Sequence, residues 1–180
     1  MDVLGDVLTV LNVEAVVYYR ATFSGPFSVA MPAESRHIRF HLGCRGKAWI
    51  GLPGGENAVI GAGDLVLIPH GSAHILADGQ KTPTVPLEDM LKQARSERVG
   101  CIAYGGNGRD VEVLCGHFAY REENAHPFIA SLPPLIHIKA HEQQDYAWLK
   151  VVFQQVDKER RLGLPGHQEV LRRQIGRAHV

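Results

Sequence analysis

The feature that most constrains the fold of this chain is a series of short runs rich in β-branched and aromatic residues, most of them ended by glycine or proline. Ser24-Gly25-Pro26 and Pro53-Gly54-Gly55 are two of these breaks. Many short strands at this spacing predict a sandwich or barrel rather than a parallel sheet with crossover helices. We expect strands over Ala15–Phe23, Phe27–Ala30, His37–Cys44, Ala48–Leu52, Ala58–Ile60, Asp64–Ile68, His74–Leu76 and Val111–Tyr120.

Helical periodicity marks the two ends of the chain. Apolar residues of Asp2–Leu11 share one helical face, those of Tyr146–Arg161 do the same, and a further helical stretch covers Gln168–Gln174. The polar stretch Gly79–Asp110 interrupts the strand pattern and holds a short helix at Leu87–Arg95, and a loop this long inside a compact domain is usually functional or mobile. The predicted fold class is therefore mainly β, a barrel or jelly roll followed by C-terminal helices.

Composition limits the function classes. The 180 residues, 45% of them hydrophobic, suit one domain with a sizeable core. Nineteen acidic and nineteen basic side chains cancel, whereas a domain that grips duplex phosphate normally carries a basic face. Three cysteines without CxxC spacing argue against a disulfide framework and a Cys-rich zinc site. The first residues lack the features of a secretion signal, and no apolar run reaches the roughly eighteen residues that span a bilayer, so we expect a cytoplasmic protein without membrane contact.

The most informative segment is Gly63–His74, which has the spacing G-x5-P-x-G-x2-H. The residues alone indicate a buried apolar strand, a turn that needs proline and glycine, and a histidine at the start of the return strand. The spacing resembles the second sequence motif of the cupin β-barrels, and Phe40–Gly46 followed by Ala48–Ile50 resembles the strand-turn-strand of the first motif. The resemblance implies that His74 points into the barrel, where this histidine is a metal ligand in the family.

Further elements follow in the order of one particular group. Val113–Phe118, His126-Pro127 and Leu132–Leu135 come after the two motifs. From about Asp2 to Arg173 the pattern resembles the N-terminal, ligand-sensing cupin domain of AraC/XylS-type transcription regulators. The resemblance implies a sensor that binds a small-molecule effector, forms a homodimer through its helical segment, and reaches DNA only through a helix-turn-helix domain that is absent from this sequence.

The first motif departs from the pattern of the cupin enzymes. Counting back from Gly46, this chain has Arg39 where that motif places a metal-binding glutamate, and Glu34 or Ser35 where it places a histidine. A guanidinium cannot donate electrons to a metal ion and would repel it. We therefore expect no enzymatic activity and no resident cofactor. Two alternatives stay open: a stand-alone metal-dependent cupin enzyme, and a metal-free cupin that binds small molecules outside transcription.

Strand parity predicts which residues face the barrel interior. Arg39 and His41 lie two apart on one strand and so share a face, which His74 joins through its motif position. One cation with two imidazoles suits a small anionic or polar effector, while the simpler alternative is that the histidines satisfy buried backbone groups. A zinc or copper site made by His41, His74 and either Cys115 or His117 is a further hypothesis.

Two cysteines are candidates for redox sensing. Cys115 lies in a predicted strand, and Cys44 ends another. A buried cysteine usually fills apolar space, but a partly exposed thiolate of lowered pKa can be oxidised and can reshape a pocket.

The domain boundaries follow from these segments. Residues 1–140 form the predicted sensor barrel with 79–110 as its long insertion, and residues 141–174 form a helical dimerisation or linker segment. Residues 175–180 read like the translation of a common sequencing adapter. We expect these last residues to be a non-native tail, and the native gene to run on into the DNA-binding domain.

Overall fold

Two β-sheets make up the domain in a computed structural model that describes residues 14–79, 81–98, 100–119 and 127–141. The larger sheet has the strand order β12-β6-β3-β11-β1-β10-β9, and the smaller one has the order β5-β4-β7-β2-β8. The elements are β1 (Glu14–Ser24), β2 (Ser28–Met31), β3 (His37–Arg45), β4 (Ala48–Gly51), β5 (Asn57–Ile60), β6 (Leu65–Ile68), β7 (His74–Ala77), β8 (Val85–Pro86), α2 (Leu87–Gln93), β9 (Arg95–Arg98), β10 (Cys101–Gly105), β11 (Asp110–Ala119), α3 (Pro127–Ser131) and β12 (Ile136–Ile138).

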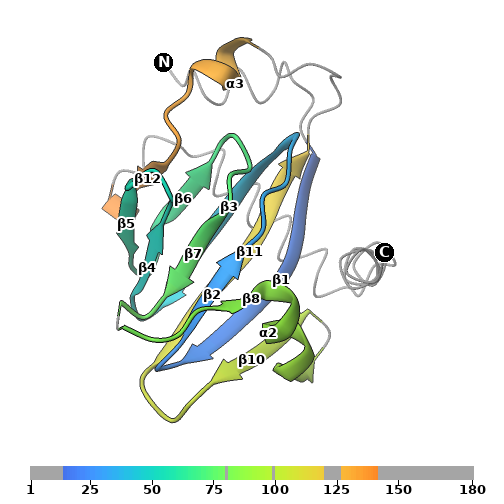
Figure 1. The fold of residues 1–180 in the computed structure, drawn as a ribbon, viewed down its shortest axis with the longest axis vertical. Coiled ribbons are helices and arrows are strands. Elements are labelled where there is room, and N and C mark those ends of the chain that lie inside the picture. Colours follow the sequence, from blue (N-terminus) through green and yellow to red (C-terminus); the bar gives the residue numbers. More distant parts are fainter. Residues whose placement is uncertain (1–13, 80, 99, 120–126, 142–180) are drawn as a thin grey trace.

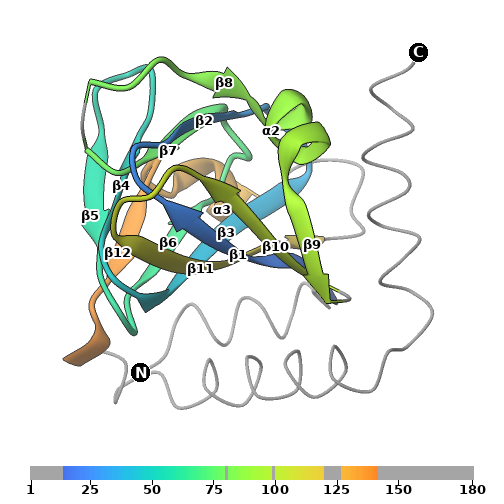
Figure 2. The ribbon, with the colours of Figure 1, turned by 90° about the horizontal axis from the view of Figure 1, so that it is seen from below.

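The two sheets face each other around a common core. Figure 1 shows the smaller sheet in front of the larger one, with α2 beside β8 at one end and α3 at the other. Seen from below, the sheets curve around one interior (Figure 2). Phe23 and Phe27 stack there with ring centroids 4.7 Å apart, and Val29, Ile50 and Leu76 are fully buried. The predicted mainly β, barrel-like fold is confirmed.

Strand β3 lies inside the larger sheet and has both of its faces buried. It pairs antiparallel with β6 on one side and with β11 on the other. Its even-numbered residues Ile38 and Phe40 are buried, and the Phe40 ring lies 5.1 Å from that of Phe118. The odd-numbered residues Arg39 and His41 are buried as well. Apolar residues thus occupy one face of β3 and polar residues the other, as the alternation predicts.

The segment Gly79–Asp110 holds more regular structure than its polar sequence indicates. Helix α2 begins at Leu87, as expected, and ends at Gln93. Strand β10 pairs parallel with β1, and β9 pairs antiparallel with β10. The segment that was expected to interrupt the strand pattern therefore adds two strands, β10 and β9, to the edge of the larger sheet. The physical reason is that β10 obtains its hydrogen bonds from a strand far away in the sequence.

Some predictions lie outside the described residues. They are the helices at Asp2–Leu11, Tyr146–Arg161 and Gln168–Gln174 and the tail at residues 175–180. Within the described segments, no helix has the length and apolar character that crossing a membrane requires.

Candidate functional site

The interior face of β3 is polar, although it borders a hydrophobic core. Apolar residues of β1, β2, β4, β5, β6 and β11 form that core. In their place β3 presents His37, Arg39 and His41. Arg39 is 1% exposed and His41 is fully buried. Because a buried polar group costs free energy unless it is hydrogen-bonded, the partners of these side chains define the site.

A row of hydrogen bonds joins His41 to both of its neighbours across the barrel. His41 Nε2 lies 2.8 Å from His74 Nε2, and His41 Nδ1 lies 3.2 Å from the Sγ of Cys115. On the far side, His74 Nδ1 lies 2.9 Å from the carbonyl oxygen of Ser72. We call this row, from Cys115 through His41 and His74 to Ser72, the thiol–imidazole chain.

Hydrogen-bond chemistry selects one protonation pattern for the thiol–imidazole chain. The Ser72 carbonyl can only accept, so His74 donates from Nδ1 and, as a neutral ring, accepts at Nε2. His41 therefore donates from Nε2, which leaves its Nδ1 to accept from the Cys115 thiol. Every member then has a partner without carrying a charge.

Burial favours these neutral forms. Desolvation lowers the pKa of His74 to about 4 and holds the pKa of His41 well below its usual value. The positive charge of Arg39 lowers both values further. Desolvation also raises the pKa of the Cys115 thiol to about 12. Near neutral pH the chain therefore consists of two neutral imidazoles and a protonated thiol.

A second polar group, which we call the Glu34 cluster, consists of Tyr18, Glu34, His37, Arg39 and His117. Arg39 Nη1 donates to Glu34 Oε2 at 3.3 Å. The Tyr18 hydroxyl donates to the same carboxylate oxygen at 2.9 Å and also contacts His117 Nδ1. His37 Nδ1 lies 3.6 Å from that oxygen, and the rings of His37 and His117 lie 4.0 Å apart. One carboxylate thus connects a cation, a phenol and an imidazole.

Burial affects the protonation of this cluster too. Desolvation raises the pKa of Tyr18, so its hydroxyl keeps the proton that it donates to Glu34. Desolvation, the neighbouring His37 and the charge of Arg39 lower the pKa of His117 to about 3. Since the Tyr18 proton points to the carboxylate, His117 Nδ1 is the donor in its contact with the Tyr18 oxygen.

A β-bulge in β1 explains how two successive tyrosines reach the interior. The register between β1 and β11 shifts between Val17 and Tyr19. Successive residues of a regular strand point to opposite faces, yet Tyr18 is 2% exposed and Tyr19 is 1% exposed, and both contact the core. A bulge redirects side chains in this way and often lies next to a functional site.

The turn between β6 and β7 positions both polar groups. Gly71 has a φ of 62°, and its nitrogen donates to the carbonyl of Ile68. A Cβ at Gly71 would lie 1.8 Å from the carbonyl oxygen of Glu34, whose own nitrogen donates to the Gly71 carbonyl at 2.8 Å. His74 follows this turn as the first residue of β7. The motif glycine therefore holds Glu34 against the turn that orients His74.

The structure divides the predicted site residues between the two groups. His41, His74 and Cys115 lie in the thiol–imidazole chain. Arg39 and His117 lie in the Glu34 cluster. Cys115 contacts the edge of the His41 ring opposite to the one that meets His74. The metal ligands predicted from the sequence therefore do not lie together: His41, His74 and Cys115 belong to the thiol–imidazole chain, and His117 belongs to the Glu34 cluster.

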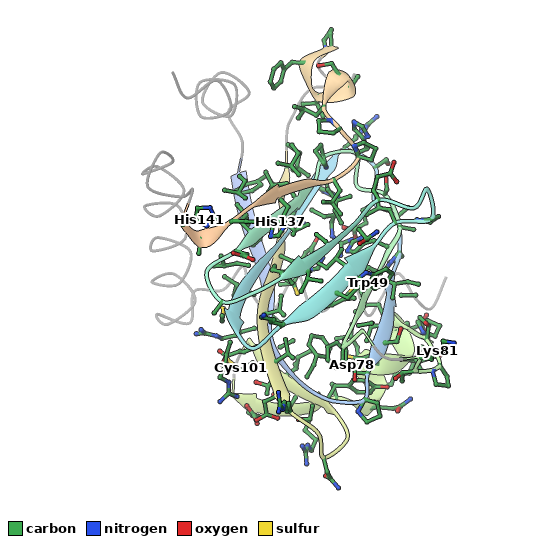
Figure 3. All side chains as sticks on the ribbon, turned by 90° about the vertical axis from the view of Figure 1, so that its left-hand side faces the viewer. Trp49, Asp78, Lys81, Cys101, His137 and His141 are labelled. Carbon is green, nitrogen blue, oxygen red and sulfur yellow. The ribbon has the colours of Figure 1, made fainter. Side chains whose placement is uncertain are left out.

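The redox candidates differ in their exposure. Cys115 is 1% exposed, whereas Cys44 is partly buried and its Sγ lies 3.6 Å from the carbonyl oxygen of Leu42. Cys101 is buried in β10, toward the α2 end of the barrel (Figure 3). None of the three cysteines forms a disulfide bond, so redox sensing stays a prediction.

Three residues of the Glu34 cluster were absent from the sequence-based candidates. They are Tyr18, His37 and Glu34, the last of which had been noted only for its place in the motif. The parity argument that selected Arg39 also selects His37, because it lies two positions earlier on the same strand. Neither the bulge that turns Tyr18 inward nor the contact between Glu34 and the Gly71 turn has a comparable sequence signal.

A family model described as Cupin matches residues 2–176. The chain belongs to the cupin family. A relative from Streptomyces lividans, named "Putative AraC-like transcription regulator", is 27% identical over 141 residues, which is 78% of this chain and 45% of the relative. The cupin chain thus spans less than half the length of that relative.

Among solved structures, the protein YhaK from Escherichia coli has a TM-score of 0.42 and 7% identity, over 66% of this chain and 39% of that one. A likeness at this level supports no inference about fold or function.

The residues of this cupin do not fit the metal set of the cupin enzymes. At the glutamate position Arg39 is buried, and its guanidinium pairs with Glu34. A metal ion there would meet a cation in place of a carboxylate ligand. The motif histidine His74 uses both ring nitrogens in hydrogen bonds to His41 and Ser72. Among the described residues, a different set, Glu34, His37 and His117, brings its ligand atoms within 4.8 Å of one another.

Proposed function

We propose that this cupin is the effector-sensing domain of an AraC-type transcription regulator. The observation that carries the proposal is the polar interior face of β3, on which a guanidinium is buried beside a hydrophobic core. A well-packed apolar face is often as stable as a buried ion pair or more so, so stability alone does not explain this face. Recognition of a ligand does explain it.

Arg39 is the residue that we expect to meet the effector. Its Nη1 donates to Glu34 and to a backbone carbonyl, while its Nε is buried without a hydrogen-bond acceptor among the described residues. Arginine recognises planar anions through two parallel hydrogen bonds. A small carboxylate would supply the missing acceptor, so we infer an anionic or polar effector of this size.

Binding and not catalysis is the proposed role. The thiol–imidazole chain is neutral, and Arg39 replaces the carboxylate that cupin enzymes use. A sensor needs a difference in effector affinity between two arrangements of the protein. The Glu34 carboxylate joins Arg39 to β1 through Tyr18, and the Glu34 backbone nitrogen donates to the Gly71 turn, so this residue could couple occupancy of the interior to the barrel wall.

The rest of the proposal concerns protein outside this chain. The named relative extends well beyond the matched region, and we infer that a DNA-binding part follows the sensor in the complete protein. We further infer a cytoplasmic homodimer, because DNA half-sites are usually contacted by paired domains.

The experiment uses protein expressed from the full gene. Thermal shifts are measured with small carboxylates, phosphate and sugars, for the wild-type protein, Arg39→Gln and the matched control Arg45→Gln. Arg45 lies on the same strand, but its side chain is 59% exposed and pairs with Asp110. A ligand at a concentration of a hundred times its Kd stabilises the folded domain by about 2.7 kcal/mol. For a domain of this size that corresponds to a rise in melting temperature of roughly 5–10 °C.

We expect one ligand class to stabilise the wild type and Arg45→Gln, but not Arg39→Gln, and to change DNA affinity in a mobility-shift assay. If Arg39→Gln keeps the full shift, the effector does not use this guanidinium. If no ligand in the panel changes either stability or DNA affinity, the sensor proposal is wrong.

A further inference from the structure

We propose that Glu34, His37 and His117 form a binding site for one divalent transition-metal ion of the zinc class. Their ligand atoms already lie within 4.8 Å of one another. Zn²⁺ with ligands at about 2.0–2.2 Å in tetrahedral geometry separates ligand atoms by about 3.3–3.6 Å. To bind the ion, the three ligand atoms therefore need to move closer together by only about 1 Å, the difference between their present separation and the tetrahedral one.

The three side chains combine access with support. The side chains of Glu34 and His37 are 21% and 27% exposed, while His117 is 8% exposed. An ion can therefore arrive from solvent and meet a buried imidazole that is held in place. His117 lies on β11 opposite Arg39, and His37 opens β3, so two paired strands supply the nitrogen ligands.

The donor set selects the class of ion. Two imidazoles and one carboxylate suit Zn²⁺ and its neighbours in the first transition row, whereas Ca²⁺ and Mg²⁺ prefer oxygen ligands alone. Three protein ligands leave a fourth position for water. The set differs from the four ligands of cupin enzymes, and it excludes the motif histidine His74, which is bonded to His41.

Neighbouring groups position the ligands. The Tyr18 hydroxyl contacts both the Glu34 carboxylate and His117 Nδ1, and such outer contacts orient metal ligands in known sites. Arg39 shares the carboxylate and places a positive charge beside the ion. We therefore expect exchangeable binding, weaker than that of a closed structural zinc site.

The site goes beyond the proposed function, because it needs neither an anionic effector nor a DNA-binding part. The assay titrates the whole 180-residue chain, freed of metal with EDTA and dialysed, with ZnCl₂ by isothermal calorimetry. A parallel titration with Co²⁺ reports ligand type through its visible absorption. His37→Gln and His117→Gln are the test variants, and His137→Gln is the matched control.

The control is closely comparable. His137 lies on β12 (Figure 3), and its Nε2 is 3.1 Å from a carboxylate oxygen of Asp64. Its side chain is 20% exposed, close to the exposure of His37. Circular dichroism checks that each variant folds. If His117→Gln fails to fold, His37→Gln still tests the proposal, because the side chain of His37 is partly exposed.

We expect one equivalent of Zn²⁺, a loss of affinity of tenfold or more in both test variants, and wild-type affinity in His137→Gln. The Co²⁺ spectrum should lack a thiolate charge-transfer band. Three results would overturn the proposal: no saturable binding, unchanged affinity in folded His37→Gln, or a thiolate band that Cys115→Ser abolishes. Each of them leaves the Arg39 experiment standing, since that experiment uses anions and sugars and adds no transition metal.

Discussion

Acidification should destabilise this domain because it protonates the interior histidines. Burial lowers the pKa of His74 to about 4, against about 6.5 in an unfolded chain. The unfolded state therefore binds a proton more readily than the folded state. The resulting stability is fully present above pH 6.5 and is lost as the pH falls from there toward 4.

The magnitude follows from the same two pKa values. Between pH 7 and pH 5, linkage gives a loss of about 2 kcal/mol from His74 alone. The pKa of His41 is also lowered, so this second histidine adds a loss of the same sign. For a domain with a free energy of unfolding of about 5–15 kcal/mol, this is a large fraction of the total.

The assay is urea unfolding followed by circular dichroism at pH 7 and pH 5, with EDTA present. His74→Gln should lose about 2 kcal/mol less than the wild type between the two pH values, as the linkage calculation requires. His70→Gln serves as the control, because His70 is exposed in the turn before β7. Carboxylates titrate in all three proteins, so their contribution cancels when the losses of unfolding free energy between pH 7 and pH 5 are compared. If His74→Gln loses as much stability as the wild type, the buried neutral imidazole is not the cause.

Three further predictions concern the cysteines and the motif turn. Cys115→Ala leaves the buried His41 Nδ1 without its donor, so the free energy of unfolding should fall by about 1–3 kcal/mol, and Cys115→Ser should recover part of this loss in urea titrations. Iodoacetamide should label the partly buried Cys44 in the folded protein well before Cys115, and equal labelling rates by mass spectrometry would contradict the observed burial. Gly71→Ala places a Cβ 1.8 Å from a backbone oxygen and should lower the free energy of unfolding by more than about 2 kcal/mol. At the control position Gly79, φ is 86° and no atom lies within 4 Å of the added Cβ, so Gly79→Ala should cost only the roughly 1–2 kcal/mol of a left-handed backbone. Equal melting temperatures of the two variants would refute this contrast.

The sequence could predict the local elements with strong patterns. Strands such as β3 and β6 appear within a residue or two of their expected bounds, because alternation and glycine breaks are local signals. The motif Gly63–His74 was enough to expect an inward histidine, and His74 is buried against His41. Arg39 at the glutamate position was also visible in the sequence.

Long-range pairing could not be predicted. Strands β9 and β10 have weak local patterns and exist because β10 pairs with β1. Strand β12 is only three residues long, and its partner β6 precedes it by about seventy residues in the chain. Such elements obtain their stability from a partner, so a window of the sequence carries little of their signal.

The sequence by itself determined that this chain forms a β-barrel with polar residues on one face of β3, because side-chain alternation needs no knowledge of partners. Only the tertiary structure decided how those residues divide. His41 bonds to His74 and Cys115, while Arg39 bonds to Glu34, which Tyr18 connects to His117. That division depends on a bulge in β1 and on a glycine turn packed against a distant loop, and distances between such segments are set by packing rather than by spacing along the chain.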